Sequence, residues 1–281
     1  MTVDAGSDPA EGSAIARVND IALGYTIDGS GRPLVLLHGG FGSVEMFGPN
    51  VAALAEARQV IGVDLQSHGR TPAVERPMRF ETMADDVAAL IRFLGHEQAD
   101  VMGYSLGGGV ALRTAIQHPG VVRRLVLVST PCRRSGWYPE VVAAFDQMGP
   151  ELAEPMKQSP MYEAYRRIAP RVEDWPILVR QLTELLKRDY DWSDDVPGLA
   201  MPVLIVVGDA DSVPPVHAAE VFELLGGGKR DAVWDRSGMT QHALAILPRT
   251  THYDIFGSPA LASAVGGFLD EGRTAGSAPA R

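Results

Sequence analysis

Residues 101–112, VMGYSLGGGVAL, place four glycines within seven positions, at the point where an apolar strand gives way to an apolar helix. A glycine inside such an element costs about 0.5–1 kcal/mol relative to alanine. The pattern G-x-S-x-G explains this cost if Ser105 stands on a sharp strand-to-helix turn, because Gly103 and Gly107 then remove Cβ atoms that would clash. We expect Gly108 and Gly109 to let the helix pack closely on the sheet. The stretch therefore predicts a serine hydroxyl presented above the end of a strand.

The flanking sequence alternates short apolar runs, dense in Val, Ile and Leu, with segments of helical period. Near-continuous apolar strands indicate burial on both faces, as in a parallel sheet covered by helices. Strand-like runs occupy 33–39, 59–65, 99–105, 124–130 and 202–209, with a weaker one at 243–248 and a strand pair over 15–28. Helices are expected over 80–95, after Ser105 as far as His118-Pro119, and after Pro214-Pro215. The sequence therefore predicts an α/β fold with a doubly wound, mostly parallel sheet.

The rhythm of strands and helices breaks over residues 131–199, where amphipathic stretches appear without a convincing strand. We interpret this segment as a helical cap inserted after the sixth strand. The core domain then comprises residues 15–130 and 200–270. Residues 1–14 and 271–281 are rich in small residues without periodicity and are predicted to be disordered tails.

The composition limits the partners and compartments of the protein. A net charge of −10 without a basic block disfavours nucleic acid or an anionic membrane. The N-terminal segment lacks the features of a signal peptide, and no apolar run is long enough to span a bilayer. A single cysteine, Cys132, excludes an internal disulfide and is expected to be a buried structural thiol. We therefore expect a soluble protein and assign it to the cytoplasm, with a homo-oligomer left open.

A serine needs a base to become a nucleophile, and that base needs an acid to orient it. Of the seven histidines, His252 follows the last strand at its carboxyl end, the edge where ligands of parallel sheets bind. The others are placed elsewhere: His68, His96, His118 and His217 in solvent-facing turns or helix ends, His242 at the wrong end of the sheet, and His38 in a loop that it holds by hydrogen bonds. The loop after 202–209 offers two acids, Asp209 and Asp211, and the turn after 124–130 offers none.

The oxyanion of a tetrahedral intermediate needs preorganised N–H donors. The backbone N–H of Leu106 supplies one, because it follows the nucleophile at a helix N-terminus. The loop HGGFG over 38–42 supplies a second, which we assign to Phe41.

These motifs together resemble the α/β-hydrolase superfamily. The matching stretches are HGGFGS (38–43), VDLQSHGRT (63–71), GYSLGGG (103–109), GDADSVPP (208–215) and TTHYDI (250–255), and the resemblance covers about residues 15–270. It implies the α/β-hydrolase fold with Asp211 as the acid of a Ser105–Asp211–His252 triad. Asp64 and His68 are expected to organise a turn beside the pocket. A serine at the nucleophile position speaks against the related epoxide hydrolases and haloalkane dehalogenases.

The sequence thus predicts a serine hydrolase that cleaves a small to medium carboxylic ester or lactone through an acyl-enzyme. Perhydrolysis, haloperoxidase-like chemistry or carbon–carbon bond hydrolysis by the same triad stays open, and a ligand sensor with slow turnover is a further alternative. Such a sensor needs a partner surface, and no exposed apolar helix or tail is evident. We expect no cofactor and no metal. Candidate substrate-binding residues are His38, Gly39, Gly40, Tyr104 and Trp175; in the cap, Met148, Met156, Met161 and Tyr162 either line the pocket or pack the cap helices.

Overall fold

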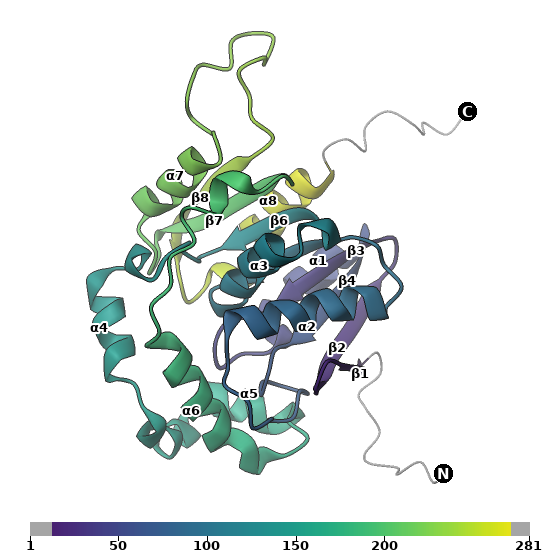
Figure 1. Cartoon of the computed structure of the whole chain (residues 1–281), viewed down its shortest axis with the longest axis vertical. Coiled ribbons are helices and arrows are strands. Elements are labelled where there is room, and N and C mark those ends of the chain that lie inside the picture. The colour runs from purple at the N-terminus through teal and green to yellow at the C-terminus, as the bar shows by residue number, and fades with distance from the viewer. Residues whose placement is uncertain (1–12, 271–281) are drawn as a thin grey trace.

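The computed structural model describes residues 13–270 and contains an eight-stranded sheet between two layers of helices (Figure 1). The strands are β1 (Ser13–Val18), β2 (Ile21–Gly29), β3 (Arg32–Leu37), β4 (Arg58–Asp64), β5 (Ala99–Tyr104), β6 (Val122–Val128), β7 (Val203–Ala210) and β8 (Ala243–Thr251). Their order in the sheet is β1-β2-β4-β3-β5-β6-β7-β8. Strands β3 to β8 are parallel, and the β1–β2 hairpin joins β4 in antiparallel orientation. The predicted doubly wound, mostly parallel sheet is confirmed.

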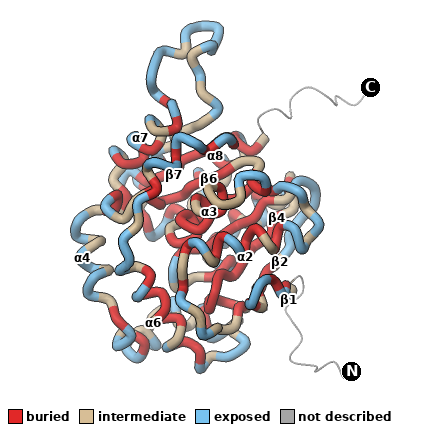
Figure 2. The backbone as a smooth tube through the Cα atoms, in the orientation of Figure 1, coloured by how far each residue is buried: buried red, intermediate tan, exposed pale blue. Residues whose placement is uncertain are grey.

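Helices cover both faces of this sheet and enclose two apolar cores (Figure 2). One core gathers residues of α2, α3 and α7, and the other gathers residues of α1 and α8. The helices are α1 (Pro49–Ala55), α2 (Phe80–Phe93), α3 (Leu106–Gln117), α4 (Pro139–Gln147), α5 (Pro160–Ile168), α6 (Trp175–Leu186), α7 (Pro215–Leu224) and α8 (Pro259–Asp270). Strands β3 to β6 are buried almost throughout, which is why their sequences are continuously apolar.

The predicted elements agree with the structure except near the ends of the chain. The helices expected over 80–95, after Ser105 and after Pro214 are α2, α3 and α7, whereas α1 and α8 carry no signal that we used. Strand β8 extends to Thr251, three residues beyond the weak run that predicted it. The predicted N-terminal tail is too long by two residues, because Ser13 and Ala14 pair with β2. Residues 1–12 and 271–281 lie outside the described part of the chain.

The segment 131–199, predicted as a cap, leaves the sheet after β6 and returns before β7 with helices α4, α5 and α6 (Figure 1). Its two ends meet. The Trp192 N–H donates to the Cys132 carbonyl at 3.0 Å, and the Arg134 N–H donates to the Tyr190 carbonyl at 2.8 Å. A single bridge between Arg133 and Asp191 completes this pairing. We refer to residues 131–199 as the cap segment.

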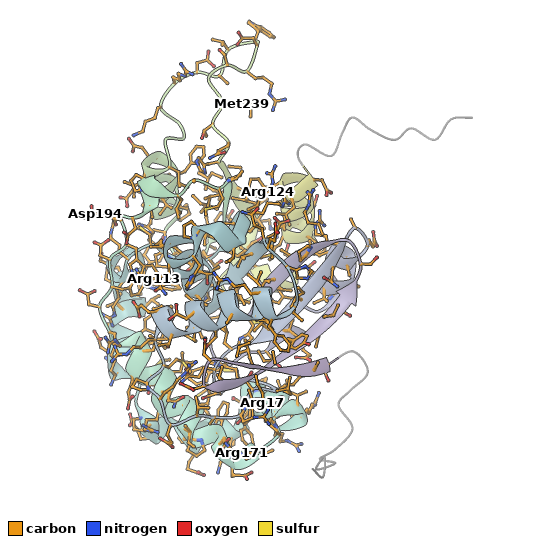
Figure 3. All side chains as sticks on the ribbon, turned by 45° about the vertical axis from the view of Figure 1, so that its right-hand side comes forward. Arg17, Arg113, Arg124, Arg171, Asp194 and Met239 are labelled. Atoms are coloured by element: carbon orange, nitrogen blue, oxygen red, sulfur yellow. The ribbon has the colours of Figure 1, made fainter. Side chains whose placement is uncertain are left out.

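A long connection over residues 225–242 projects beyond α7 and β8, and Figure 3 shows Met239 on it. Trp234 on this connection is fully exposed, and the side chains of Val233 and Met239 are about half exposed. The connection precedes the parallel strand β8, so it lies at the end of the sheet opposite Ser105. The expectation that the chain shows no exposed apolar surface fails here, because a loop without periodicity carries no sequence signal of its exposure. Within residues 13–270, no helix has both the length and the apolar character needed to cross a bilayer.

Candidate active site

Ser105 stands between β5 and α3 with φ +52° and ψ −115°, a backbone conformation that residues with a side chain rarely adopt. The two glycines of the motif make this turn sterically accessible. A Cβ atom on Gly103 would lie 2.0 Å from the Gly107 carbonyl oxygen, and one on Gly107 would lie 2.4 Å from the Leu37 carbonyl oxygen. Neither contact is compatible with a side chain, so the predicted role of these glycines agrees with the structure.

The next two glycines allow close approach of neighbouring elements. A Cβ atom on Gly108 would lie 2.5 Å from Cγ2 of Thr130, just after β6, and one on Gly109 would lie 2.5 Å from the ring of Phe80. Phe80 begins α2, so Gly109 permits contact between helices rather than the helix–sheet contact that we expected.

His252 and Asp211 complete a continuous chain of hydrogen bonds from the serine. His252 Nε2 lies 3.2 Å from Ser105 Oγ, and His252 Nδ1 lies 2.9 Å from Asp211 Oδ1. Because the carboxylate accepts from Nδ1–H, Nε2 is left to accept the serine proton. Strand β8 brings His252 to the carboxyl edge of the sheet, and the loop after β7 brings Asp211. The structure thus joins the three residues selected from the sequence.

Asp211 is buried and satisfied on both carboxylate oxygens. Oδ1 also accepts from the Val213 N–H at 3.2 Å, while Oδ2 accepts from the Gly208 N–H at 3.0 Å and the Ser129 hydroxyl at 2.5 Å. Burial favours the neutral acid, but the hydrogen bonds from His252, Ser129 and Gly208 outweigh it and hold the pKa of Asp211 below its ordinary value. Asp211 is therefore ionised and fixed toward the imidazole.

Asp209, the other acid in this loop, is exposed and makes a different contact. Its Oδ1 accepts the Thr250 N–H at 3.2 Å, which ties the end of β7 to β8. Ser129, which the sequence analysis did not single out, lies at the end of β6 with φ +51° and donates to Asp211. Its place at the carboxyl end of a central strand is the signal that could have identified it.

The oxyanion loop differs from our expectation at one donor. The N–H of Phe41 donates to His68 Nε2 at 3.2 Å, so it is not directed at Ser105. Its neighbour Gly40 lines the cavity, and within residues 13–270 the N–H of Gly40 has no hydrogen-bond acceptor. The same holds for the N–H of Leu106. Gly40 therefore replaces Phe41 as the second candidate donor, and Leu106 stays the first.

His38 and His68 support this loop from below as a pair of fully buried rings with centroids 4.9 Å apart. His38 Nδ1–H donates to the Gly39 carbonyl, and His38 Nε2 accepts from the Leu65 N–H. His68 Nδ1–H donates to the Gln66 carbonyl, so each ring is a neutral imidazole. Burial lowers the pKa of both rings, that of His68 well below its ordinary value.

The expectation that His68 and His217 face solvent is wrong, since both are buried. His217 accepts from the Cys132 N–H at 3.3 Å and lies 3.0 Å from Glu220. Cys132 is a buried free thiol as expected, although a histidine does lie beside it. Burial nevertheless raises the pKa of the Cys132 thiol.

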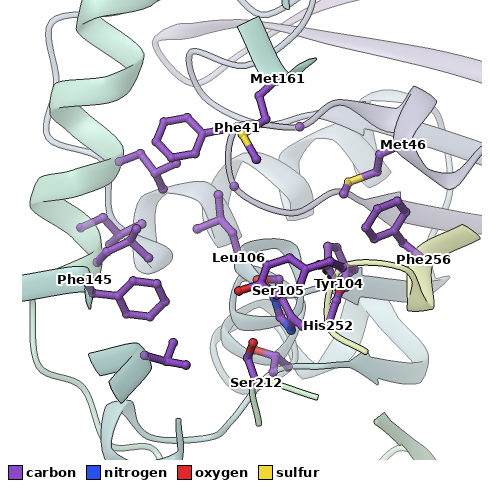
Figure 4. A pocket seen from close by; sticks show the side chains of 18 of the residues that line it. Phe41, Met46, Tyr104, Ser105, Leu106, Phe145, Met161, Ser212, His252 and Phe256 are labelled. Carbon is purple, nitrogen blue, oxygen red and sulfur yellow. Dashed lines mark hydrogen bonds between the residues drawn. The ribbon is translucent and has the colours of Figure 1, made fainter. Parts of the chain in front are cut away.

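Ser105 opens into a cavity of about 550 Å³ between the sheet and the cap segment (Figure 4). Its wall is mostly apolar. The loops after β3, β5 and β8 contribute Gly40, Met46, Leu106 and Phe256, and the cap segment contributes Trp137, Phe145, Met161 and Leu182 among others. A cavity of this size and character suits a small apolar ligand.

Among the candidate substrate-binding residues, Gly40 and Tyr104 line this cavity, whereas His38, Gly39 and Trp175 do not. Trp175 is fully buried: its indole N–H donates to the Ala153 carbonyl at 2.9 Å, and its ring packs on Phe41, Tyr162 and Tyr165. The tryptophan that does line the cavity is Trp137. Of the cap residues considered, Met148 and Met161 line the cavity, but Met156 and Tyr162 do not. No group of three potential metal ligands occurs among residues 13–270.

Comparisons with known proteins identify the family. Residues 32–158 match the family model described as alpha/beta hydrolase fold. The chain is similar to the pimeloyl-[acyl-carrier protein] methyl ester esterase of Aeromonas hydrophila, with 34% identity over 234 residues that span 74% of this chain and 89% of that protein. It therefore belongs to the α/β hydrolase family and is a hydrolase.

Solved structures share this fold at lower identity. A thermophilic esterase from Thermogutta terrifontis superposes with a TM-score of 0.66 at 24% identity, over 89% of this chain and 94% of that one. The enol-lactonase from Burkholderia xenovorans LB400 superposes with a TM-score of 0.69 at 22% identity, over 92% of this chain and all of that one.

Proposed function

We propose that the protein is a serine hydrolase that cleaves carboxylic esters, lactones included, through an acyl-enzyme on Ser105. One observation carries this proposal. The hydrogen-bond chain from Ser105 through His252 to Asp211 ends on a strained turn at the wall of an apolar cavity. A nucleophile, a base, an orienting acid and free N–H donors are the components that acyl transfer requires.

In the first half-reaction His252 Nε2 takes the proton of the Ser105 hydroxyl while Oγ attacks the substrate carbonyl. The N–H groups of Leu106 and Gly40 stabilise the oxyanion, and Asp211 stabilises the imidazolium. His252 then returns the proton to the leaving alcohol, and the acyl-enzyme remains. Water repeats the sequence: His252 takes a proton from it, the hydroxide attacks the acyl carbon, and Ser105 regains its proton as the acid leaves.

The similarity to a named methyl ester esterase supports ester hydrolysis as the reaction. We further propose that the enzyme acts without a metal or cofactor, because the residues around Ser105 suffice for every proton transfer in this scheme. Cytoplasmic location is likewise our proposal, supported by the single free thiol, and subcellular fractionation tests it.

The experiment that tests the function combines turnover with labelling. The purified chain is assayed with p-nitrophenyl esters of increasing acyl length and treated with a fluorescent alkyl phosphonate, followed by peptide mass spectrometry. We expect ester turnover and a phosphonate adduct on Ser105 that Ser105→Ala abolishes. Turnover that persists in Ser105→Ala, or an unlabelled Ser105 in an inactive wild type, contradicts the proposal.

A further inference from the structure

The cavity has two unequal sides, separated by Ser105. Figure 4 shows Phe145 and Met161 on one side of Ser105, and Met46 and Phe256 on the other. The first side is built by three cap helices, which contribute Val141, Phe145, Met161, Ala164, Leu182 and Leu185 to the lining. We call it the cap side.

The second side is narrower and consists of large side chains from the core domain, which we call the core side. The rings of Tyr104 and Phe256 have centroids 5.2 Å apart. Opposite them, Met46 packs on the oxyanion loop, with its Sδ accepting from the Gly39 N–H at 3.3 Å. These contacts leave the core side little room, whereas flexible methionine and leucine side chains surround the cap side.

The position of His252 decides which half of an ester enters each side. His252 Nε2 must reach the leaving oxygen in order to protonate it. The His252 ring lies against Tyr104, with centroids 5.1 Å apart, and Tyr104 in turn contacts Phe256. The leaving alcohol therefore lies on the core side. Leu106, whose N–H receives the carbonyl oxygen, lies between Ser105 and the cap side in Figure 4, so the acyl chain extends toward the cap helices.

We propose that the substrates are esters of a long or bulky apolar acyl group with a small alcohol, the acyl group occupying the cap side and the alcohol the core side. This assignment rests on the proposed function of Ser105.

The charges along the cap side support an uncharged acyl chain. Arg134 is the one cation among the lining residues. Its guanidinium already donates to Asp146 at 2.6 Å and to the Leu186 carbonyl at 3.0 Å. A carboxylate on the acyl chain would have to displace Asp146, whereas a methylene chain meets matching apolar walls.

Two isomeric esters test the assignment, because they have equal carbon numbers and differ only in orientation. Methyl octanoate places the long chain on the acyl half, and octyl acetate places it on the alcohol half. We expect kcat/KM to favour methyl octanoate by about tenfold or more, since each misplaced methylene loses binding. Equal rates, or a preference for octyl acetate, overturn the assignment.

Variants on each side make the test independent of a single substrate pair. Ala164→Phe fills the cap side, and should lower kcat/KM for methyl octanoate about tenfold relative to methyl butanoate while the octyl acetate to methyl butanoate ratio holds. Phe256→Ala opens the core side and should raise the octyl acetate to methyl octanoate ratio about fivefold. Ala144→Phe is the matched control, because Ala144 is exposed on α4 and does not line the cavity; its ratios should equal those of the wild type.

The outcomes separate the two proposals. If the variants fold, as a thermal melt shows, and Ala164→Phe shifts octyl acetate instead of methyl octanoate, the sides are reversed and the inference is wrong while ester hydrolysis stands. If neither isomer is cleaved and Ser105 resists the phosphonate, the proposed function itself fails.

Discussion

The indole of Trp137 stands nearly perpendicular to the imidazole of His252, with ring centroids 5.5 Å apart and 75° between the planes. Trp137 belongs to the cap segment. Its N–H donates to the Tyr190 hydroxyl at 3.3 Å, and its ring meets Phe145 edge-on. The cap segment therefore contacts the catalytic base of the proposed triad directly, in addition to enclosing the substrate.

We expect Trp137→Ala to lower kcat about 10- to 100-fold, because His252 loses a neighbour that fixes its orientation and excludes water. Trp137→Phe retains an aromatic ring and should stay within about threefold of the wild type. Steady-state kinetics on one ester, with a thermal melt for each variant, measure this. A Trp137→Ala variant whose Tm falls while kcat is unchanged identifies Trp137 as a packing residue.

Substitutions at Ser105 separate catalysis from backbone strain. Ser105→Ala and Ser105→Gly both remove the hydroxyl, so each should leave at most the residual catalysis of the oxyanion hole. Only glycine relieves the positive φ of +52°. We expect Ser105→Gly to be more stable than Ser105→Ala by about 1 kcal/mol, after the entropic cost of glycine. Urea denaturation of the pair gives the difference, and a more stable alanine variant shows that the strain lies elsewhere.

The two aspartates of the β7–β8 edge should differ sharply. Asp211→Asn should lower kcat by up to about 10⁴, because the amide presents the wrong partner to His252 Nδ1–H. Asp209→Asn should cost about tenfold or less, because Asp209 contacts only the Thr250 N–H among these residues. Both variants are assayed on the same ester near pH 8. A larger loss for Asp209→Asn would show that the acid is misassigned.

His68 should act on the reaction through the oxyanion loop. His68→Leu leaves the Phe41 N–H without its acceptor, and an unsatisfied buried donor costs about 1–3 kcal/mol of stability. We expect kcat to fall about tenfold as Gly40 shifts, with KM little changed. His68→Gln keeps an acceptor and should recover most of kcat. Equal losses of kcat for the two variants contradict a role of this hydrogen bond.

Acid should destabilise the fold through its buried histidines. Burial lowers the pKa of His38, His68 and His217 below the ordinary value of 6.5. As the pH falls below about 6.5 the unfolded chain gains protons that the folded chain refuses. Stability is therefore fully present above this pH and declines below it, by up to about 1.4 kcal/mol per pH unit for each histidine. Urea titrations at pH 7.5, 6.5 and 5.5 measure the slope, which His217→Gln should reduce.

The sequence predicts those features that depend on chain order and on strand ends. Ser105, Asp211 and His252 follow successive parallel strands at their carboxyl ends, and the sheet brings these ends together whatever the details of packing. The second oxyanion donor depends on a single torsion, φ +56° at Phe41, and on the tautomer of His68. Neither is encoded in a local pattern, so the donor was misassigned by one residue.

The cap segment is the least predictable part, because its aromatic residues have no periodicity that separates packing from lining. Trp175 and Trp137 look alike in sequence, yet Trp175 anchors α6 against Phe41 while Trp137 faces His252. Met46 and Phe256 were also missed, although both lie just after strands β3 and β8, and that position could have marked them as candidates.

The meeting of the two ends of the cap segment, at Cys132–Trp192 and Arg134–Tyr190, bears on how this enzyme diversifies. An insertion that enters and leaves the core at one point can be lengthened, shortened or exchanged between lineages without shifting the register of β6 and β7. The glycines at 103 and 107 allow no such drift, since any side chain there meets backbone. Reaction chemistry and substrate choice are thus inherited on separate stretches of the chain, and new specificities arise by changing residues 131–199 alone.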